Sequence, residues 1–171
     1  LVDLLNAISG YVTTSSCSGR IVLLEGEFQK PITTWRFVSH EQVAIDLWPH
    51  LTKSHGNGGV LRQSVWFRME GAILHVKCET LKQADTFIHL ARTCGFKRTG
   101  AIHLARPVVE LVSSETITLP VMRDGVPLIN SEYLALLVQE SNVFLERNHE
   151  KLRRLTHELR KHYDASSSAL A

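Results

Sequence analysis

Two segments of the chain have hydrophobic residues at the three- and four-residue spacing that is typical of an amphipathic helix. In the first, residues 80–94, Thr80 stands at the N-cap position and Gly95 suits the left-handed conformation that ends a helix. In the second, residues 130–163, one stripe of apolar and small polar side chains recurs at near-heptad spacing, at Leu134, Leu137, Val138, Ser141, Leu145, Asn148, Leu152, Leu155 and Leu159. The pattern predicts a short helix and a long C-terminal helix. Residues 1–9 are expected to form the end of another helix, which stops at Gly10.

Short runs of β-branched, aromatic and aliphatic residues between these segments predict strands. The predicted strands are residues 11–14, 20–25, 33–39, 61–69, 72–78, 97–104, 108–113 and 116–122. Residues 20–25 are almost continuously apolar, which indicates a strand that is buried on both faces. Two-residue alternation on residues 72–78 separates Leu74, Val76 and Cys78 from Ile73, His75 and Lys77. The same alternation on residues 33–39 separates Trp35, Phe37 and Ser39 from Arg36, Val38 and His40.

The remaining segments predict turns, a loop and one further helix. The polar residues 15–19 and the pair Asp124–Gly125 are expected to form turns, and residues 61–69 and 72–78 to pair through a turn at Glu70 and Gly71. Residues 41–53 suit a helix whose last turn Pro49 disrupts, and residues 55–59, HGNGG, suit a loop.

This order of elements predicts an α+β fold with a mixed or largely antiparallel sheet, flanked by helices and closed by the long C-terminal helix. A length of 171 residues favours a single domain. We place it at residues 1–163, followed by a small, polar and flexible tail at residues 164–171. Because the chain starts at Leu1 within an apolar helical pattern, we expect its N-terminus to be trimmed.

The composition, 44% hydrophobic and 21% charged, is that of an ordinary globular protein. No apolar run approaches the roughly 18 residues of a membrane span and no signal peptide is apparent, so we expect a soluble, cytoplasmic protein without membrane contact. The three cysteines have no CxxC spacing, which fits thiols in a reducing compartment. The net charge of +2 is too small to mark a nucleic-acid-binding protein. Any RNA-binding face must therefore come from clustering, for which the basic last third of the long helix is a candidate.

The densest polar cluster is residues 13–20, which lies between two predicted strands. Its hydroxyl groups, its glycine and Arg20 suit the binding of a carboxylate or phosphate, with Arg20 forming a bidentate pair. The alternative is an ordinary Ser/Thr-rich turn that ends in a surface arginine.

Cysteine, histidine and tryptophan offer further candidate chemistry. Cys17 could act as a nucleophile with His40 or His75 as its base, or it is a buried structural thiol. A zinc site is not expected, because strand alternation sends His75 and Cys78 to opposite faces. The tryptophans, of which Trp66 stands near Arg68, are either core residues or platforms for stacking a base.

Several well-known motifs are absent from the sequence. No GxGxxG links a strand to a helix, HGNGG lacks the lysine and hydroxyl residue of a P-loop, and there is neither a GxSxG nor an HExxH sequence. The residues by themselves therefore predict a binding cleft and no particular reaction.

Five segments, in order along nearly the whole chain, resemble the tRNA wybutosine-synthesizing protein 3 family. The first, YVTTSSCSGRIVLL at residues 11–24, looks like the family signature. Similar matches are WRFVSH (residues 35–40), FRMEGAILHVKC (67–78), ARTCGFKRTGA (91–101), and Pro120 with residues 130–154. The chain departs from the family pattern at Gly71, where proline is common, and at Thr99 and Ala101 on either side of Gly100.

The resemblance implies an S-adenosylmethionine-dependent methyltransferase with a non-Rossmann domain, which agrees with the missing glycine motif. Such enzymes methylate N4 of the tricyclic base next to the anticodon in tRNA(Phe), the 7-(3-amino-3-carboxypropyl)-4-demethylwyosine. The resemblance also allows contacts with other enzymes of wybutosine synthesis. The apolar stripe of the long helix permits a dimer without requiring one.

The resemblance also suggests roles for residues at the matching positions. Arg20 and Arg68 are expected to bind a carboxylate or phosphate, and Ser15 and Ser16 to orient the bound group. Trp35 or Trp66 would stack a flipped-out purine, and His40 or His75 would act as the catalytic base. The matching positions Cys17, Ser18, Gly19 and Gly100 complete the expected binding set, which contains no metal.

Two other functions remain open at this point. One is a non-catalytic tRNA-binding or assembly module of the same pathway. The other is a hydrolase that depends on Cys17 or on a metal, with His40 and His75 as partners.

Overall fold

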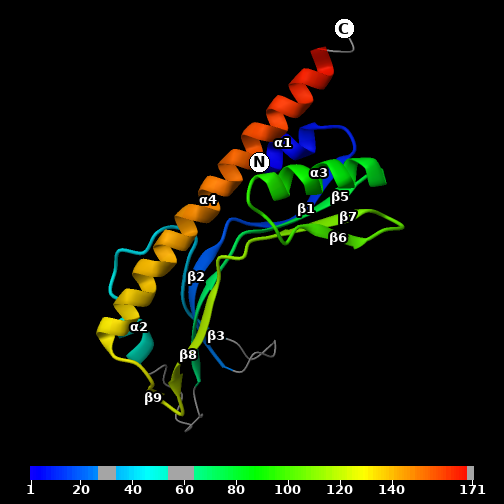
Figure 1. Ribbon diagram of the computed structural model, residues 1–171. Coiled ribbons are helices and arrows are strands. Elements are labelled where there is room, and N and C mark those ends of the chain that lie inside the picture. Colours follow the sequence, from blue (N-terminus) through cyan, green and yellow to red (C-terminus); the bar gives the residue numbers. More distant parts are fainter. Residues whose placement is uncertain (27–33, 54–63, 169–171) are drawn as a thin grey trace. The chain divides into compact units, whose positions relative to one another are not determined.

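The computed structural model of the protein describes residues 1–26, 34–53 and 64–168, with the backbone alone for residues 165–168 (Figure 1). The helices are α1 (Val2–Ala7), α2 (Trp48–Thr52), α3 (Leu81–Thr93) and α4 (Ser131–Ser168). The strands are β1 (Tyr11–Cys17), β2 (Arg20–Glu25), β3 (Thr34–Ser39), β4 (Val65–Glu70), β5 (Ile73–Cys78), β6 (Gly100–His103), β7 (Val108–Val112), β8 (Ile117–Arg123) and β9 (Val126–Pro127). The loop predicted at residues 55–59 lies outside the described residues.

The strands form two antiparallel sheets, which confirms the α+β class. One sheet has the order β1-β5-β7-β6 and the other the order β3-β2-β4-β8-β9. The predicted pairing of the strands around Glu70 and Gly71 is wrong. A strand has only two hydrogen-bonding edges, and β4 uses both on β2 and β8 while β5 uses both on β1 and β7.

The chain forms two compact units, each with its own sheet. Unit 1 comprises residues 1–18, 71–114 and 147–171, and unit 2 comprises residues 19–70 and 115–146. Helix α4 contributes residues 131–146 to unit 2 and its remainder to unit 1. The single domain over residues 1–163 stays a prediction.

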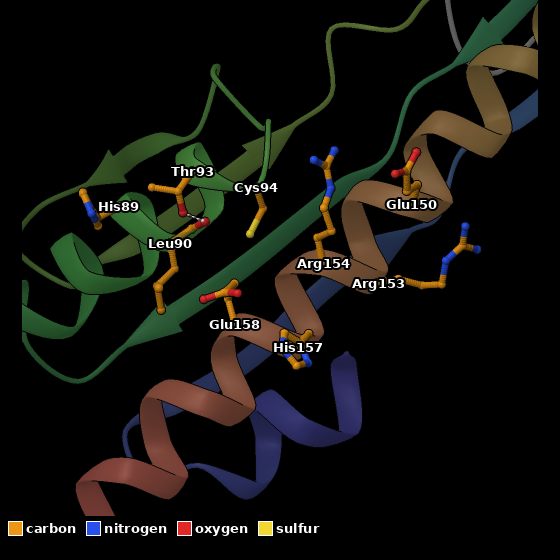
Figure 2. A pocket seen from close by; sticks show the side chains of 9 residues that line it. All are labelled: His89, Leu90, Thr93, Cys94, Glu150, Arg153, Arg154, His157 and Glu158. Carbon is orange, nitrogen blue, oxygen red and sulfur yellow. Dashed lines mark hydrogen bonds between the residues drawn. The ribbon is translucent and has the colours of Figure 1, made fainter.

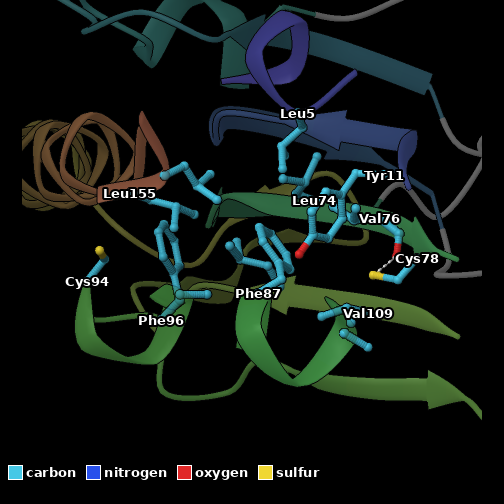
Figure 3. Close-up of a cluster of buried hydrophobic side chains, with 14 of the residues drawn as sticks. Leu5, Tyr11, Leu74, Val76, Cys78, Phe87, Cys94, Phe96, Val109 and Leu155 are labelled. Carbon is cyan, nitrogen blue, oxygen red and sulfur yellow. Dashed lines mark hydrogen bonds between the residues drawn. The ribbon is translucent and has the colours of Figure 1, made fainter. Parts of the chain in front are cut away.

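The core of unit 1 lies between its sheet and helices α1, α3 and α4 (Figures 1 and 3). It contains Leu5, Tyr11, Leu74, Val76, Cys78, Phe87, Phe96, Val109, Leu111, Leu155 and Leu159, among others. The predicted inward face of β5 is confirmed. Helix α3 begins with a capping box, in which Thr80 Oγ1 accepts from the Gln83 amide and Gln83 Oε1 accepts from the Thr80 amide. It ends before Gly95, whose φ of +103° suits glycine.

Polar atoms inside this core are hydrogen-bonded. The Tyr11 hydroxyl donates to the Gln83 carbonyl at 2.9 Å and lies 2.6 Å from the Tyr163 hydroxyl, which is therefore the donor of that second bond. Burial raises the pKa of Tyr11 and of Tyr163, and it raises the pKa of the Cys78 thiol to about 11. These groups are consequently neutral at physiological pH, as a buried core requires.

The core of unit 2 contains the inward side chains of β2, β4 and β8 and the first part of α4. Its members include Ile21, Leu23, Leu47, Leu51, Val65, Phe67, Met69, Val121, Leu134, Leu137, Val138 and Leu145. Every residue of β2 from Ile21 to Leu24 is buried, as predicted. The side chain of Asn130, which precedes α4, accepts a hydrogen bond from the Tyr133 amide and so caps the helix.

Two local predictions in these segments are wrong. The helix expected over residues 41–53 is reduced to α2, residues 48–52. Pro49 lies in the first turn of α2, where its missing N–H costs nothing, whereas in a helix that began at residue 41 it would lie in the interior and remove a hydrogen bond. Residues 15–17 belong to strand β1 rather than to a turn. A bulge at Thr14 shifts the β1–β5 register and lets the polar run continue along the sheet edge.

A second bulge changes the predicted faces of β3. Leu23 pairs with Phe37 and Leu24 pairs with Trp35, so Arg36 is the extra residue. Phe37 therefore packs against the core of unit 2, whereas Trp35 belongs to the opposite face and is 46% exposed. The predicted grouping of Trp35 with Phe37 is wrong because a bulge interrupts the two-residue alternation.

Arg36 uses this bulge to reach a buried ion pair. Its side chain is 1% exposed and its Nε lies 2.7 Å from Glu25 Oε2, on a carboxylate that is 12% exposed. The Arg36 guanidinium also donates to the carbonyls of Leu51 and Lys53 at the end of α2. One arginine thus connects β2, β3 and α2.

No helix in the described part of the chain is long and apolar enough to span a bilayer.

The Arg36–Glu25 pair gives a stability prediction. Arg36→Ala should lower the free energy of unfolding by about 3–5 kcal/mol, because it leaves the Glu25 carboxylate buried without its cation. Urea unfolding followed by circular dichroism measures the change. Arg123→Ala, an exposed site in the same sheet, serves as the control and should change stability by less than about 0.5 kcal/mol.

The double variant Arg36→Met with Glu25→Leu should recover most of the lost stability, since no buried charge remains. A loss in Arg36→Ala no larger than in the control would contradict this assignment.

Candidate functional site

Five polar or aromatic side chains lie on one face of the sheet of unit 2, opposite its core. In the β2–β4 register Arg20 pairs with Glu70 and Leu24 with Trp66, and Leu24 also pairs with Trp35 of β3. Directly opposed residues point to the same face of a sheet. Arg68, two residues before Glu70 on β4, shares this face. We call Arg20, Trp35, Trp66, Arg68 and Glu70 the arginine–tryptophan face.

Glu70 is the centre of the charged contacts on this face. Its Oε2 lies 2.5 Å from Arg20 Nε and its Oε1 lies 3.1 Å from an Nη of Arg68. The Arg20 guanidinium carbon lies 4.7 Å from the ring centroid of Trp35, which is a cation–π contact. One carboxylate and one aromatic ring therefore fix the orientation of Arg20. The three charged side chains remain about a quarter to a third exposed.

His40, at the end of β3, is fixed by the turn that precedes Arg20. Its Nδ1 lies 2.9 Å from the Gly19 carbonyl oxygen. A carbonyl only accepts, so Nδ1 carries the proton of this bond, and in the neutral ring the lone pair is on Nε2. Gly19 is buried and has a φ of +107°, a conformation that favours glycine at this turn. Ser18 stands next to it and is half-buried.

A second group of candidates crosses the sheet of unit 1 in one row, on the face opposite its core. Ser15 of β1 pairs with His75 of β5, His75 pairs with Glu110 of β7, and Glu110 pairs with Gly100 of β6. His75 Nε2 lies 3.0 Å from Glu110 Oε1. The carboxylate fixes the tautomer, so the Nδ1 of neutral His75 carries the lone pair. We call Ser15, His75, Glu110 and Gly100 the histidine row.

The other residues of the SSCSG run do not all join this row. Cys17 opposes Ile73 and shares the face of the histidine row, diagonal to His75. Ser16 opposes Leu74, a core residue, and so points to the opposite face from Ser15. Among the described residues no cluster of three or more His, Cys, Asp or Glu side chains is arranged to hold a metal ion.

The predicted site residues therefore fall into two sets, one in each unit. Unit 2 brings together Arg20, Trp35, Trp66 and Arg68, with Gly19 and His40 at the adjoining turn. Unit 1 brings together Ser15, Cys17, His75 and Gly100, while Ser16 points away.

The sequence analysis missed two acidic partners, Glu70 and Glu110. Each left a signal in its strand. Glu70 stands two residues after Arg68, and therefore on the same strand face. Glu110 is the one acidic residue in VVELV, the otherwise apolar strand β7. From the two-residue alternation along each strand, both side chains could have been predicted to lie on the face opposite the core.

The arginine–tryptophan face has side chains that can bind a ligand with a carboxylate, an ammonium group and an aromatic ring. Guanidinium groups bind a carboxylate in bidentate geometry. The Glu70 carboxylate can accept from an ammonium group, and indole rings stack on purines. The histidine row can accept a proton at His75 Nδ1 and stabilise the resulting imidazolium through Glu110.

A family model described as Methyltransferase TYW3 matches residues 1–161 of the chain. Two curated relatives carry the name tRNA(Phe) 7-((3-amino-3-carboxypropyl)-4-demethylwyosine(37)-N(4))-methyltransferase. The relative from Thermococcus sibiricus is 35% identical over 167 residues, which cover 94% of this chain and 81% of that protein. The relative from Archaeoglobus fulgidus is 34% identical over 157 residues, which cover 91% and 77%.

Solved structures agree with these matches. The PH1069 protein from Pyrococcus horikoshii superposes with a TM-score of 0.81 at 30% identity, over 92% of this chain and 81% of that one. A hypothetical protein from Aeropyrum pernix superposes with a TM-score of 0.77 at 27% identity, over 94% and 93%. The family match over nearly the whole chain confirms the resemblance predicted from the SSCSGR and LHV segments: this chain belongs to the TYW3 methyltransferase family.

Proposed function

We propose that this protein methylates N4 of 7-(3-amino-3-carboxypropyl)-4-demethylwyosine at position 37 of tRNA(Phe), with S-adenosylmethionine as the methyl donor. The observation that carries the proposal is the family match over residues 1–161, together with the activity named for relatives at 34–35% identity. The protein works in the cytoplasm, where its tRNA substrate is processed.

The arginine–tryptophan face fits the donor. S-adenosylmethionine carries a carboxylate, an ammonium group and a purine. Arg20 and Arg68 would hold the carboxylate, Glu70 the ammonium group, and Trp35 or Trp66 the purine ring. The substrate base has the same amino and carboxyl groups on its side chain, so this face suits either molecule by the same chemistry.

Methyl transfer asks the protein mainly for positioning. When bound, the donor would supply an electrophilic methyl carbon, whose bond to the sulfonium sulfur breaks as the bond to the ring nitrogen forms, so that neutral S-adenosylhomocysteine leaves. Holding two reactants in line can contribute about 7–11 kcal/mol to lowering the barrier. A guanidinium fixed by Glu70 on one side and by Trp35 on the other suits this task, because it loses little conformational freedom on binding.

The ring nitrogen loses a proton as it gains the methyl group, and a histidine accepts it. Each unit offers one histidine with a defined tautomer, His40 with its lone pair on Nε2 and His75 with its lone pair on Nδ1. His75 has the additional support of Glu110, which stabilises the charged ring. Ser15, beside His75 in the histidine row, orients the group bound there. Gly19 forms the turn that holds His40, Gly100 leaves open space at the end of the histidine row, and Cys17 and Ser18 would complete the binding set.

Donor binding is the first prediction of this proposal. S-adenosylmethionine and S-adenosylhomocysteine should each raise the melting temperature, since a ligand at a hundredfold excess over Kd stabilises the folded state by about 2.7 kcal/mol. Differential scanning fluorimetry measures the shift, with adenosine and methionine added separately as controls. Hypomodified tRNA(Phe) should then accept a labelled methyl group, and fully modified tRNA(Phe) should not.

Tight binding of tRNA without a shift from either ligand, and without methyl transfer, would instead identify a non-catalytic tRNA-binding module.

The arginine–tryptophan face gives a second prediction. Arg20→Ala should lower kcat/KM for methyl transfer by roughly tenfold to hundredfold, because a charge-assisted hydrogen bond to the ligand contributes roughly 1.5–3 kcal/mol. Arg20→Lys keeps the charge without the bidentate geometry and should recover activity only in part. Arg123→Ala, at the end of β8 in the same sheet, is the matched control. Unchanged donor affinity and activity in Arg20→Ala would contradict a role of Arg20 in binding the ligand.

The two histidines can be separated by a third prediction. The variant that removes the base should lower kcat by roughly 10²–10⁴-fold and flatten the acidic limb of the pH–rate profile. We expect this of His75→Ala, with a smaller loss in Glu110→Gln because the partner only orients the ring. His40→Ala, the matched comparison in the other unit, should chiefly raise KM through the Gly19 turn. The reverse pattern would assign the base to His40.

A further inference from the structure

A groove runs along unit 1 between α3 and the second part of α4, on the helical side of its sheet and therefore not on the face that carries the histidine row (Figure 2). Its volume is about 740 Å³. Helix α3 and the cap that follows it supply His89, Leu90, Thr93 and Cys94, and helix α4 supplies Glu150, Arg153, Arg154, His157 and Glu158. Leu90 and Cys94 face Arg154 and Glu158 across the groove. We call it the α3–α4 groove.

Positive charge is concentrated on the two segments that border this groove. Residues 89–98 and 147–161 together hold nine Lys and Arg residues and two Glu residues. The whole chain has 19 Lys and Arg against 17 Asp and Glu, so the rest of the chain has ten basic and fifteen acidic residues. The small net charge is therefore the sum of a basic region, which borders the groove, and an acidic remainder of the chain.

The basic side chains of this surface are accessible. Arg153, Arg154 and Arg160 are exposed on α4, and Lys97 and Arg98 are exposed just after α3. The two flanks are in contact, because the Lys151 side chain packs over Gly95 and lies 6.0 Å from the ring centroid of Phe96. From residue 147 to residue 161 the helix extends about 21 Å. The cations consequently form a strip along this side of α4, which Glu150 and Glu158 interrupt.

We propose that the α3–α4 groove binds the phosphodiester backbone of the tRNA, outside the nucleotide that is methylated. This inference rests on the proposed function, which makes tRNA the substrate. Guanidinium groups match phosphate oxygens in bidentate geometry, and a strip of this length meets several consecutive phosphates. It adds affinity and orientation without reading the base sequence.

The two glutamates of the groove favour RNA over other polyanions. Glu150 and Glu158 repel phosphate at their own positions, but a carboxylate accepts a hydrogen bond from a ribose 2′-hydroxyl. Along α4 a glutamate stands at each end of the arginine pair, in the order Glu150, Arg153, Arg154 and Glu158, so the groove offers groups for phosphate at its middle and for 2′-hydroxyls at its ends. An all-DNA strand offers only the phosphate half of this pattern.

The experiment measures tRNA affinity by fluorescence anisotropy between 50 and 300 mM salt. The groove variant is R153Q/R154Q/R160Q, which changes three exposed positions of α4 to a good helix former. Arg153 and Arg154 line the groove, and Arg160 follows the last of its lining residues on the same helix. Its affinity for tRNA(Phe) should fall at least about tenfold at 150 mM salt. The slope of log K against log salt should become less steep by roughly 0.7–0.9 for each phosphate that no longer pairs with a cation. K97Q/R98Q, on the other flank, should reduce affinity and slope in the same direction.

The matched control removes the same charge elsewhere. K82Q/R106Q/R123Q changes three exposed residues outside the groove and should keep the wild-type slope, with affinity within about threefold, because cations that pair with no phosphate release no counterions on binding. In methyl-transfer assays the groove variant should raise KM for tRNA. Its kcat at saturating tRNA and its KM for S-adenosylmethionine should stay at wild-type values.

The outcomes separate this proposal from the proposed function. Equal affinity and salt slope in the groove variant, the control and the wild type would overturn the groove assignment while donor binding still supports a methyltransferase. Groove-dependent tRNA binding without any donor-induced thermal shift or methyl transfer would support the groove and overturn the catalytic function. Equal effects of the groove and control variants would show that tRNA affinity depends only on the net charge of the protein. This result would overturn the groove as a defined binding site.

Discussion

One hydrophobic stripe on α4 completes both cores of the protein. Leu134, Leu137, Val138 and Leu145 pack in the core of unit 2, and Leu155 and Leu159 pack in the core of unit 1. Each sheet has an apolar face that must be covered, and neither is covered by short local helices alone. Since burying a leucine side chain is worth roughly 1.5–3 kcal/mol, the continuity of this stripe is the condition on which both units depend.

The two faces of each sheet also determine where the candidate site residues lie. Once α4 and its neighbouring helices cover one face of each sheet, two-residue alternation sends every other side chain to the opposite face. On β4 this separates Phe67 and Met69, in the core, from Trp66, Arg68 and Glu70. On β5 it separates Leu74 and Val76 from His75. Rigid strands thus hold the candidate binding and proton-accepting groups, which suits a reaction that depends on positioning.

Charge is distributed by the same logic on α4. Its buried stripe is apolar, with Ser141 and Asn148 as small polar exceptions, and its exposed side in unit 1 is predominantly basic. The core thereby fixes which helix side faces outward, and the outward side carries the cations that border the α3–α4 groove. A protein with a net charge of only +2 can in this way present a surface suited to a polyanion.

Sequence patterns alone predicted the elements whose signals are local. The N-cap Thr80 and the apolar stripe of α3, the long α4, the buried strand β2 and the two faces of β5 all follow from residues close together in the chain. The SSCSGR and LHV segments likewise indicated the family and pointed to Arg20 and His75. Only the tertiary structure decided which strands pair, where bulges at Thr14 and Arg36 shift the register, and that Glu70 holds Arg20 while Glu110 holds His75. Strand pairing depends on which hydrogen-bonding edges are still available after distant segments have docked, and a one-residue shift in register changes every neighbour.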